Sequence, residues 1–301
     1  MEKTTRRDFL LRLGATAVSP VLSSALPPFF HGAEGRGRSA DEEMFRTKVE
    51  WADANRLSES PFGEIVGAIG RSFLDTPYVA HSLETSGAEE LIVNLRAFDC
   101  VTFVESTLAI ARCIRTAKTS FNDFRRELQR LRYRNSVLDG YASRLHYFSD
   151  WIQDNEKKGV VKNISGELGG ETHRKVLNFM STHRSSYPQL HDEVVLKRIE
   201  HLETEISQRP LQIISRSVVA EAEPRMQTGD IVALATSMAG IDFSHTGLAV
   251  VSEERVRYLH APLSGGSVQL SPASLGEYVR QGTKSLTGIS VVRPLDPVAR
   301  P

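Results

Sequence analysis

The chain has few cysteines and no excess of charge of either sign. Its two cysteines, Cys100 and Cys113, are too few among 301 residues for the disulfide framework that stabilises small secreted domains. Its 37 basic residues balance its 37 acidic residues, so no net field attracts nucleic acid or an anionic membrane surface. We therefore expect no nucleic-acid partner, and specificity must come from a local site.

The N-terminal segment lacks an apolar run long enough to span a bilayer, because Arg12 and Pro20 interrupt it. Residues 4–10, with two adjacent arginines, resemble the twin-arginine export signal, and the small residues at 23–25 are typical of a signal-peptidase site. We expect residues 1–25 to be a signal peptide for the twin-arginine export machinery. The mature protein is then periplasmic or otherwise exported, without a stable membrane span. A fortuitous amphipathic N-terminal helix is the alternative.

Two kinds of pattern divide the rest of the chain. Residues 26–41 are typical of a linker, since they are rich in Gly, Arg and Ser after Phe29. From Glu42 to Arg209 apolar residues recur mostly at helical spacing, whereas short β-branched runs alternate with turn residues afterwards. This order predicts an α+β fold in which helices pack on one face of an antiparallel sheet, within one domain over residues 42–301.

The expected elements can be placed on the chain. Helices are predicted from Cys100 to about Lys118, at 121–138 and at 198–206. Strands are predicted at 211–214, 230–234, 246–251 and 289–292.

Cys100 stands where a helix begins. Asp99 is a favourable N-cap residue, so Cys100 is expected at the first helical position, beside the unpaired N–H groups of the first turn. Those groups stabilise a thiolate and an oxyanion, although the charge on Asp99 acts in the opposite sense. The alternative is a small buried hydrophobic side chain, which is our interpretation of Cys113. The two cysteines lie roughly 20 Å apart on one helix, too far for a disulfide.

Two histidines are placed to serve a thiol nucleophile. His245 begins one strand, with Gly247 allowing close backbone approach, and His260 ends the next strand, beyond a turn at 252–254. An antiparallel hairpin brings these positions together, so His245 is predicted to take the proton of Cys100 while His260 orients its ring. We expect no metal or other cofactor. A zinc site on the same three residues is the second interpretation, weakened because no His-x-x-x-His or Cys-x-x-Cys pair occurs.

The order of four short motifs resembles a known superfamily. Asp99-Cys100 is followed by Gly229-Asp230-Ile231, then Ser244-His245-Thr246-Gly247, then Leu259-His260-Ala261. This order is similar to that of the NlpC-type papain-like cysteine hydrolases of bacterial cell walls. The resemblance implies a cysteine-bearing helix packed on an antiparallel sheet, with additional N-terminal and inserted helices. It also implies a nucleophile, a base and an orienting residue at the three positions chosen above.

Further stretches resemble one branch, the N-acetylmuramoyl-L-alanine amidase-like family long known as a domain of unknown function. They are residues 73–78, the cysteine motif up to Glu105, residues 141–151 and residues 178–181, and the likeness extends over 64–294. It implies a peptidoglycan or muropeptide substrate, cut at the amide between the lactyl group of N-acetylmuramic acid and L-alanine. Anhydro-muropeptides released during wall turnover are one candidate form of that substrate.

Several polar residues near these motifs are candidates for substrate binding. Tyr78 either positions the substrate or packs under the cysteine helix. Arg144, His146 and Tyr147 form a polar-aromatic cluster near Trp151. This cluster either binds a substrate carboxylate or sugar ring, or it contains an internal ion pair. Glu105 is interpreted as a structural hydrogen-bond partner. The candidate binding residues are Tyr78, Asp99, Arg144, His146, Tyr147 and Ser244.

Three functions stay open on the sequence. The first is a thiol amidase, and the second is an endopeptidase of the same fold that cuts within the stem peptide. The third is a non-catalytic wall-binding protein that retains the substrate groove. The complete set of nucleophile and base argues against this third function, because a binding protein does not require it.

Overall fold

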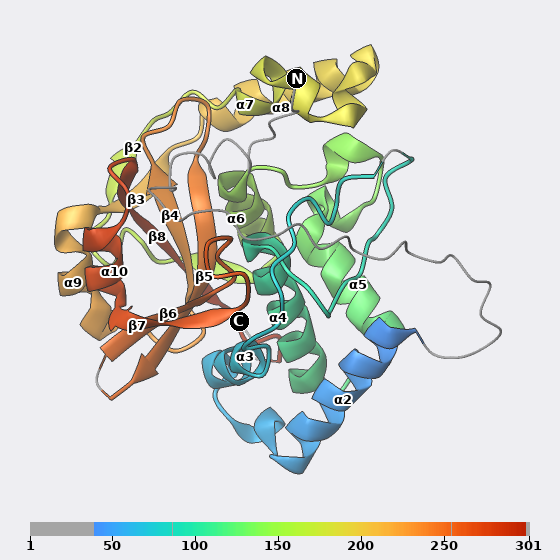
Figure 1. The fold of residues 1–301 in the computed structure, drawn as a ribbon, viewed down its shortest axis with the longest axis vertical. Coiled ribbons are helices and arrows are strands. Elements are labelled where there is room, and N and C mark those ends of the chain that lie inside the picture. The colour runs from blue at the N-terminus through green and yellow to red at the C-terminus, as the bar shows by residue number, and fades with distance from the viewer. Residues whose placement is uncertain (1–38, 86, 254, 299–301) are drawn as a thin grey trace, which may run out of the picture.

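An antiparallel sheet with helices on both sides forms the frame of the molecule (Figure 1). The computed structural model describes residues 39–85, 87–253 and 255–298. Eight strands form one sheet in the order β2-β3-β8-β4-β5-β6-β7, and β1 also pairs with β8. The mixed α+β class and the antiparallel pairing expected from the sequence are confirmed.

The elements are named by their order along the chain. The helices are α2 (Ala40–Ala54), α3 (Phe62–Arg71), α4 (Cys100–Arg115), α5 (Phe121–Arg132), α6 (Phe148–Lys157), α7 (Phe179–Thr182), α8 (Glu193–Ser207), α9 (Val219–Ala222) and α10 (Leu275–Gln281). The strands are β1 (Val161–Asn163), β2 (Glu171–His173), β3 (Leu211–Ser215), β4 (Ile231–Thr236), β5 (Phe243–Ser252), β6 (Arg255–His260), β7 (Gln269–Ser274) and β8 (Leu286–Pro294).

The central strand β4 is buried on both faces of the sheet. Ile231 and Ala233 join the apolar cluster around α4, whereas Val232 and Leu234 join the cluster around α9 and α10. Figure 1 shows α9 and α10 on one side of the sheet and α3, α4 and α6 on the other. The expectation that helices cover one face only is therefore wrong. The uninterrupted apolar run at 231–235 is the pattern of a strand covered on both faces.

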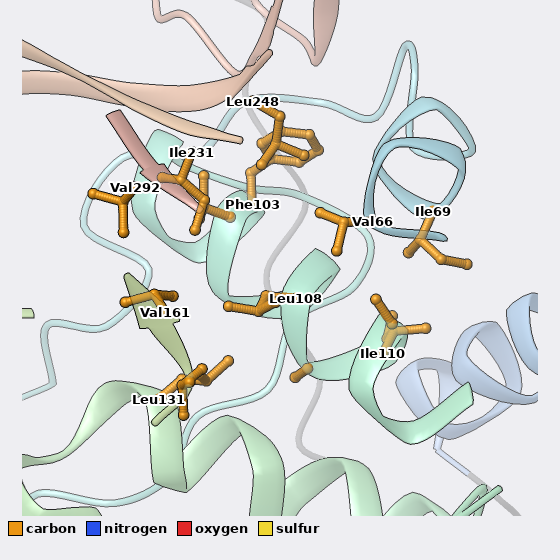
Figure 2. Packing of buried hydrophobic residues seen from close by; sticks show 14 of the residues in the cluster. Val66, Ile69, Phe103, Leu108, Ile110, Leu131, Val161, Ile231, Leu248 and Val292 are labelled. Atoms are coloured by element: carbon orange, nitrogen blue, oxygen red, sulfur yellow. The ribbon is translucent and has the colours of Figure 1, made fainter. Parts of the chain in front are cut away.

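Helix α4 runs through the interior, and every residue from 102 to 114 is buried. Figure 2 shows Phe103 beside Leu248 of β5, with Leu108 further along the helix. Because α2 and α5 pack on its outer side and β5 on its inner side, α4 is enclosed all round. Packing therefore fixes the position of its first residue.

The N-terminus of α4 is closed by a capping box. The Asp99 carboxylate accepts hydrogen bonds from the N–H groups of Val101 and Thr102, both at 2.9 Å, and the Asp99 N–H donates to Thr102 Oγ1. The predicted N-cap and the predicted helix start at Cys100 are confirmed. The helix ends at Arg115, three residues before the expected end.

The N-terminal half holds less helix than its periodicity predicts. Two short strands, β1 and β2, occur within it, and the described residues of the 72–99 segment, 72–85 and 87–99, contain no helix. Helix α5 ends at Arg132 rather than at residue 138, because Tyr133 adopts an extended conformation. In the second half, all four expected strands are present, but β7 and α10 were not predicted.

Residues 1–38 lie outside the described part of the chain. The expected signal peptide at 1–25 and most of the expected linker at 26–41 fall there. Ala40 and Asp41 belong to the first turn of α2, so the end of that linker is helical. No helix within the described ranges is long and apolar enough to cross a membrane.

A buried ion pair ties α4 to α5. Arg132 donates from Nε to Glu105 at 2.8 Å, and both side chains are almost completely buried. Burial raises the pKa of Glu105, and the charge of Arg132 opposes that rise. Glu105 is thus a structural partner, as the sequence predicts.

Glu105→Ala is expected to lower the free energy of unfolding by about 3–5 kcal/mol, because it leaves the Arg132 charge buried without its carboxylate. Glu59→Ala removes one partner of the exposed Arg56–Glu59 pair and should cost less than about 1 kcal/mol. Urea unfolding of both variants measures the difference. Equal losses would contradict a structural role for the buried pair.

Candidate active site

A cavity of about 910 Å³ lies between the helical layer and the sheet. Cys100 at the start of α4 and His245 on β5 both line it, together with Tyr78, Ser244 and Tyr278. Residues of the 81–84 loop, of the α6 and α7 segments, and of the 262–264 and 281–286 segments also line it. The nucleophile and base predicted from the sequence therefore share one solvent-accessible space.

Cys100 is half-buried, in contrast to the fully buried Cys113. Burial raises the pKa of the Cys113 thiol to about 12, so that sulfur stays protonated and inert. Cys100 occupies the first position of a 16-residue helix, where the helix dipole favours negative charge. The thiol suited to nucleophilic chemistry is the one at the cavity.

The N–H groups of the first turn are less available than the sequence suggested. Those of Val101 and Thr102 donate to the Asp99 carboxylate, and that of Phe103 donates to the Asp99 carbonyl at 3.0 Å. The expectation that several helix-start N–H groups bind an oxyanion is therefore wrong for these three.

The two histidines meet across the β5–β6 hairpin. Gly247 pairs with His260 in the register, and His245 Nε2 lies 2.8 Å from His260 Nδ1. A Cβ atom on Gly247 would come within 2.6 Å of the Leu259 carbonyl oxygen, so only glycine permits this approach. Opposite His245, a β-bulge at 234–235 interrupts the β4–β5 ladder, a device that re-aims side chains beside functional sites.

His260 is enclosed by aromatic rings and is only 1% exposed. Its ring stacks on Tyr258 with centroids 4.5 Å apart, and it meets Tyr278 nearly at right angles at 5.2 Å. Burial, with a smaller contribution from the neighbouring His245, lowers the pKa of His260 from 6.5 to about 2. His260 is therefore a neutral imidazole at any physiological pH.

Cys100 lines the same cavity as His245 and acts electrostatically on Tyr258, the ring that stacks on His260. Burial raises the pKa of the Tyr258 hydroxyl well above 10, and Tyr278 and the charge of Cys100 add to the rise. Tyr258 in turn lies 5.9 Å from His245, measured between ring centroids. His245 and His260 therefore both lie beside the ring of Tyr258.

The predicted substrate-binding residues are divided by the structure. Arg144 touches the cavity, but it donates to the Leu83 carbonyl and to Glu84, at 2.7 and 2.8 Å, and is only 4% exposed. Arg144 thus forms an internal ion pair with Glu84, which is the alternative that the sequence analysis left open. Tyr147 does not line the cavity, because its hydroxyl donates to Glu203 at 2.6 Å within a buried cluster. The prediction for Tyr147 is therefore wrong.

The remaining candidates also differ in placement. Tyr78, Ser244 and His146 line the cavity, and His146 Nε2 lies 2.8 Å from the Tyr141 carbonyl oxygen. Asp99 is completely buried and its carboxylate serves as the helix cap, so it is not placed to contact substrate.

Tyr278 and His81 are among the cavity residues that the sequence analysis did not single out. Tyr278 lies on α10, whose capping box of Ser274 and Glu277 is a recognisable helix start. His81 has a backbone φ of 60°, and nothing in the sequence around it indicates this left-handed conformation. Among the residues that the structure describes, no group of three or more His, Cys, Asp or Glu side chains is arranged to hold a metal ion.

Comparison with known proteins agrees with this geometry. The model of the N-acetylmuramoyl-L-alanine amidase-like family matches residues 68–288, which include the thiol and both imidazoles. The fold and its cavity are thus those of an amidase-type enzyme of bacterial cell-wall chemistry. The chain belongs to the N-acetylmuramoyl-L-alanine amidase-like family. No curated protein sequence matches it.

Solved structures extend the comparison. An N-acetylmuramoyl-L-alanine amidase from Bacteroides uniformis is 33% identical with a TM-score of 0.74, over 78% of this chain and 99% of that one. A Bacteroides fragilis protein described as a candidate xylanase is 35% identical with a TM-score of 0.69, over 75% and 99%. A Legionella pneumophila protein from a domain-of-unknown-function family is 19% identical with a TM-score of 0.65, over 84% and 94%, and shares the fold.

The low pKa of His260 predicts a pH-dependent stability. Below the unfolded-state pKa of 6.5 the unfolded chain binds a proton that the folded chain refuses, so the free energy of unfolding falls as pH falls. Lowering pH from about 7.5 to about 5.5 should cost about 1.4 kcal/mol through this group. In urea unfolding, the free energy of unfolding of the His260→Gln variant should depend less on pH, because this contribution is absent. The variant His201→Gln, at an exposed site, should keep the pH dependence of the wild type.

Proposed function

We propose that the chain is a cysteine amidase with an NlpC-type papain-like core, in which Cys100 attacks, His245 is the base and His260 orients the base. Its substrate is the amide between the N-acetylmuramoyl group and L-alanine in peptidoglycan fragments, with anhydro-muropeptides as one form. The observation that carries the proposal is the 2.8 Å contact between the imidazoles, in a cavity that also holds the thiol at a helix start.

The contact between the rings supports Nδ1 of His245 as the nitrogen that acts as base in this proposal. His245 uses Nε2 toward His260, so Nδ1 is the nitrogen that takes the thiol proton. The thiolate then attacks the amide carbonyl, and the Cys100 amide donates to the oxyanion. Protonated Nδ1 gives its proton to the leaving nitrogen of L-alanine. Water, deprotonated by the same nitrogen, finally hydrolyses the thioester and releases the muramoyl carboxylate and the thiol.

The carboxylates of the cavity argue against glycoside hydrolysis, which the description of the Bacteroides fragilis relative raises. Glycosidases generally need two carboxyl groups beside the scissile bond. The carboxylates that line the cavity within the described residues are Glu84 and Glu105. Glu84 pairs with Arg144 and Glu105 with Arg132, so neither is placed as an acid or nucleophile.

Cys100→Ala should lower the turnover of a muramoyl-peptide by about a thousandfold or more, because it removes the nucleophile. Cys113→Ala is the matched control and should retain activity, since Cys113 is completely buried and lies outside the cavity. Thermal unfolding confirms that both variants fold. Full activity in the Cys100 variant would end the proposal.

The products identify the bond that is cut. Mass spectrometry of digested muropeptides should show free sugar together with the intact stem peptide. A shortened peptide still attached to its sugar would contradict the amidase assignment and indicate a stem-peptide endopeptidase with the same cysteine chemistry.

We also propose that residues 1–25 direct the protein through the twin-arginine machinery to the periplasm, where residues 42–301 act as one domain. The adjacent Arg6 and Arg7 before an apolar run support this, as does a substrate found in the wall. Replacing both arginines by lysine should retain the protein in the cytoplasm, as measured by cell fractionation and immunoblotting. Unchanged periplasmic levels would contradict the assignment.

A further inference from the structure

One ring nitrogen of His260, Nε2, has no oxygen or nitrogen among the described residues as a hydrogen-bond partner. Its Nδ1 faces His245, whereas its Nε2 is completely buried and has no hydrogen-bond partner among the residues that the structure describes. A buried polar atom without a partner is costly and calls for a physical explanation. The groups that surround the imidazole here include the aromatic rings of Tyr258 and Tyr278.

The position of Tyr278 relative to His260 follows from three ring separations. Tyr258 stacks on one face of His260, with 4.5 Å between centroids and 22° between planes. Tyr278 lies 5.2 Å from His260 and 5.3 Å from Tyr258. A ring on the opposite face of His260 would lie much farther from Tyr258, so Tyr278 stands at the edge of the imidazole, with 77° between the planes. A near-perpendicular pair is attractive when the tyrosine turns its face to an N–H edge of the imidazole, because that face carries the negative part of the ring quadrupole.

The tautomer of His260 decides which nitrogen of His245 is basic. When His260 carries its proton on Nε2, its Nδ1 accepts from His245 Nε2–H, and the lone pair of His245 stands on Nδ1. When His260 carries its proton on Nδ1, it donates to His245 Nε2, and the His245 proton moves to Nδ1. His245 then has no lone pair for the thiol of Cys100.

We propose that Tyr278 is a positioning residue whose ring accepts the Nε2–H of His260 and thereby holds the tautomer in which His260 Nδ1 accepts from His245. The titratable groups around this ring are His245 from β5, Tyr258 from β6 and Tyr278 from α10, with Cys100 of α4 acting on Tyr258. The catalytic consequence rests on the proposed function, whereas the tautomer does not. Tyr278 acts through His260 and takes no part in bond making.

Nitrogen-15 NMR of the histidine side chains in the full-length protein tests the tautomer directly. The wild type is expected to show His260 protonated on Nε2, with that proton shifted upfield by the ring current of Tyr278. Tyr278→Leu should lose the upfield shift and populate the Nδ1–H form, and Tyr278→Phe should restore both features because it keeps the ring. A wild-type His260 protonated on Nδ1, or a leucine variant with an unchanged spectrum, would overturn the proposal.

Kinetics on a muramoyl-peptide test the consequence. Tyr278→Leu should lower kcat about tenfold, a part of the contribution that a well-placed general base makes, and change KM less. Tyr278→Phe should recover most of that loss. Gln281→Leu, on the same helix and lining the same cavity, is the matched control for disturbance of the cavity wall and should leave the tautomer unchanged.

Failure of the two proposals can be told apart. If the Cys100→Ala variant keeps full activity while the NMR shows Nε2–H held by Tyr278, the cysteine mechanism fails and the positioning of His260 stands. If the Cys100 variant is inactive and Tyr278→Leu keeps both kcat and the tautomer, the mechanism stands and the role of Tyr278 is wrong.

Discussion

The enclosure of α4 is the constraint on which the rest of the site depends. A helix packed on all sides cannot slide or rotate without breaking many apolar contacts, so its first residue has a fixed place. Burial of the helix removes its polar groups from water. Near the N-terminal end, the Asp99 cap pairs backbone N–H groups, and Arg132 pairs the Glu105 carboxylate. The N–H groups of Val101 and Thr102 donate to this cap, so they stabilise the start of the helix and are not available to a ligand.

The sheet contributes the second half of the site from its other face. Tyr258, two residues before His260, belongs to the apolar cluster that α9 and α10 cover, whereas Phe103 of α4 belongs to the cluster on the opposite face. The thiol and the imidazoles can share a cavity only where the strands end, and the bulge opposite His245 marks that place. Gly247 then lets the hairpin close tightly enough for the rings to meet. Two separate cores thus hold Cys100 and His245, the two partners of the proposed proton transfer.

What the sequence predicts correctly here is local, and what it misses is long-range. A cap residue before Cys100 and a hairpin joining His245 to His260 depend on a few neighbouring residues, so their geometry can be predicted from spacing. Arg144 and Tyr147 lie in one polar-aromatic stretch, and both were predicted to bind substrate. Their hydrogen-bond partners, Glu84 and Glu203, lie 60 and 56 residues away along the chain, so local spacing does not reveal them. Likewise, the cover that α10 gives to the second face, and the position of Tyr278 beside His260, arise only when the C-terminal segments fold back on the sheet.

The choice of a neutral second imidazole has an electrostatic logic. A carboxylate in the place of His260 would carry its charge into a site that is 1% exposed and faced by two tyrosine rings, where an ion without a partner is expensive. A neutral acceptor raises the basicity of His245 less than a carboxylate does. A cysteine nucleophile tolerates this, because a thiol gives up its proton far more readily than a serine hydroxyl. The charge in the proposed cycle then alternates between the Cys100 sulfur and the His245 ring alone, and the buried ring behind them keeps its protonation state throughout.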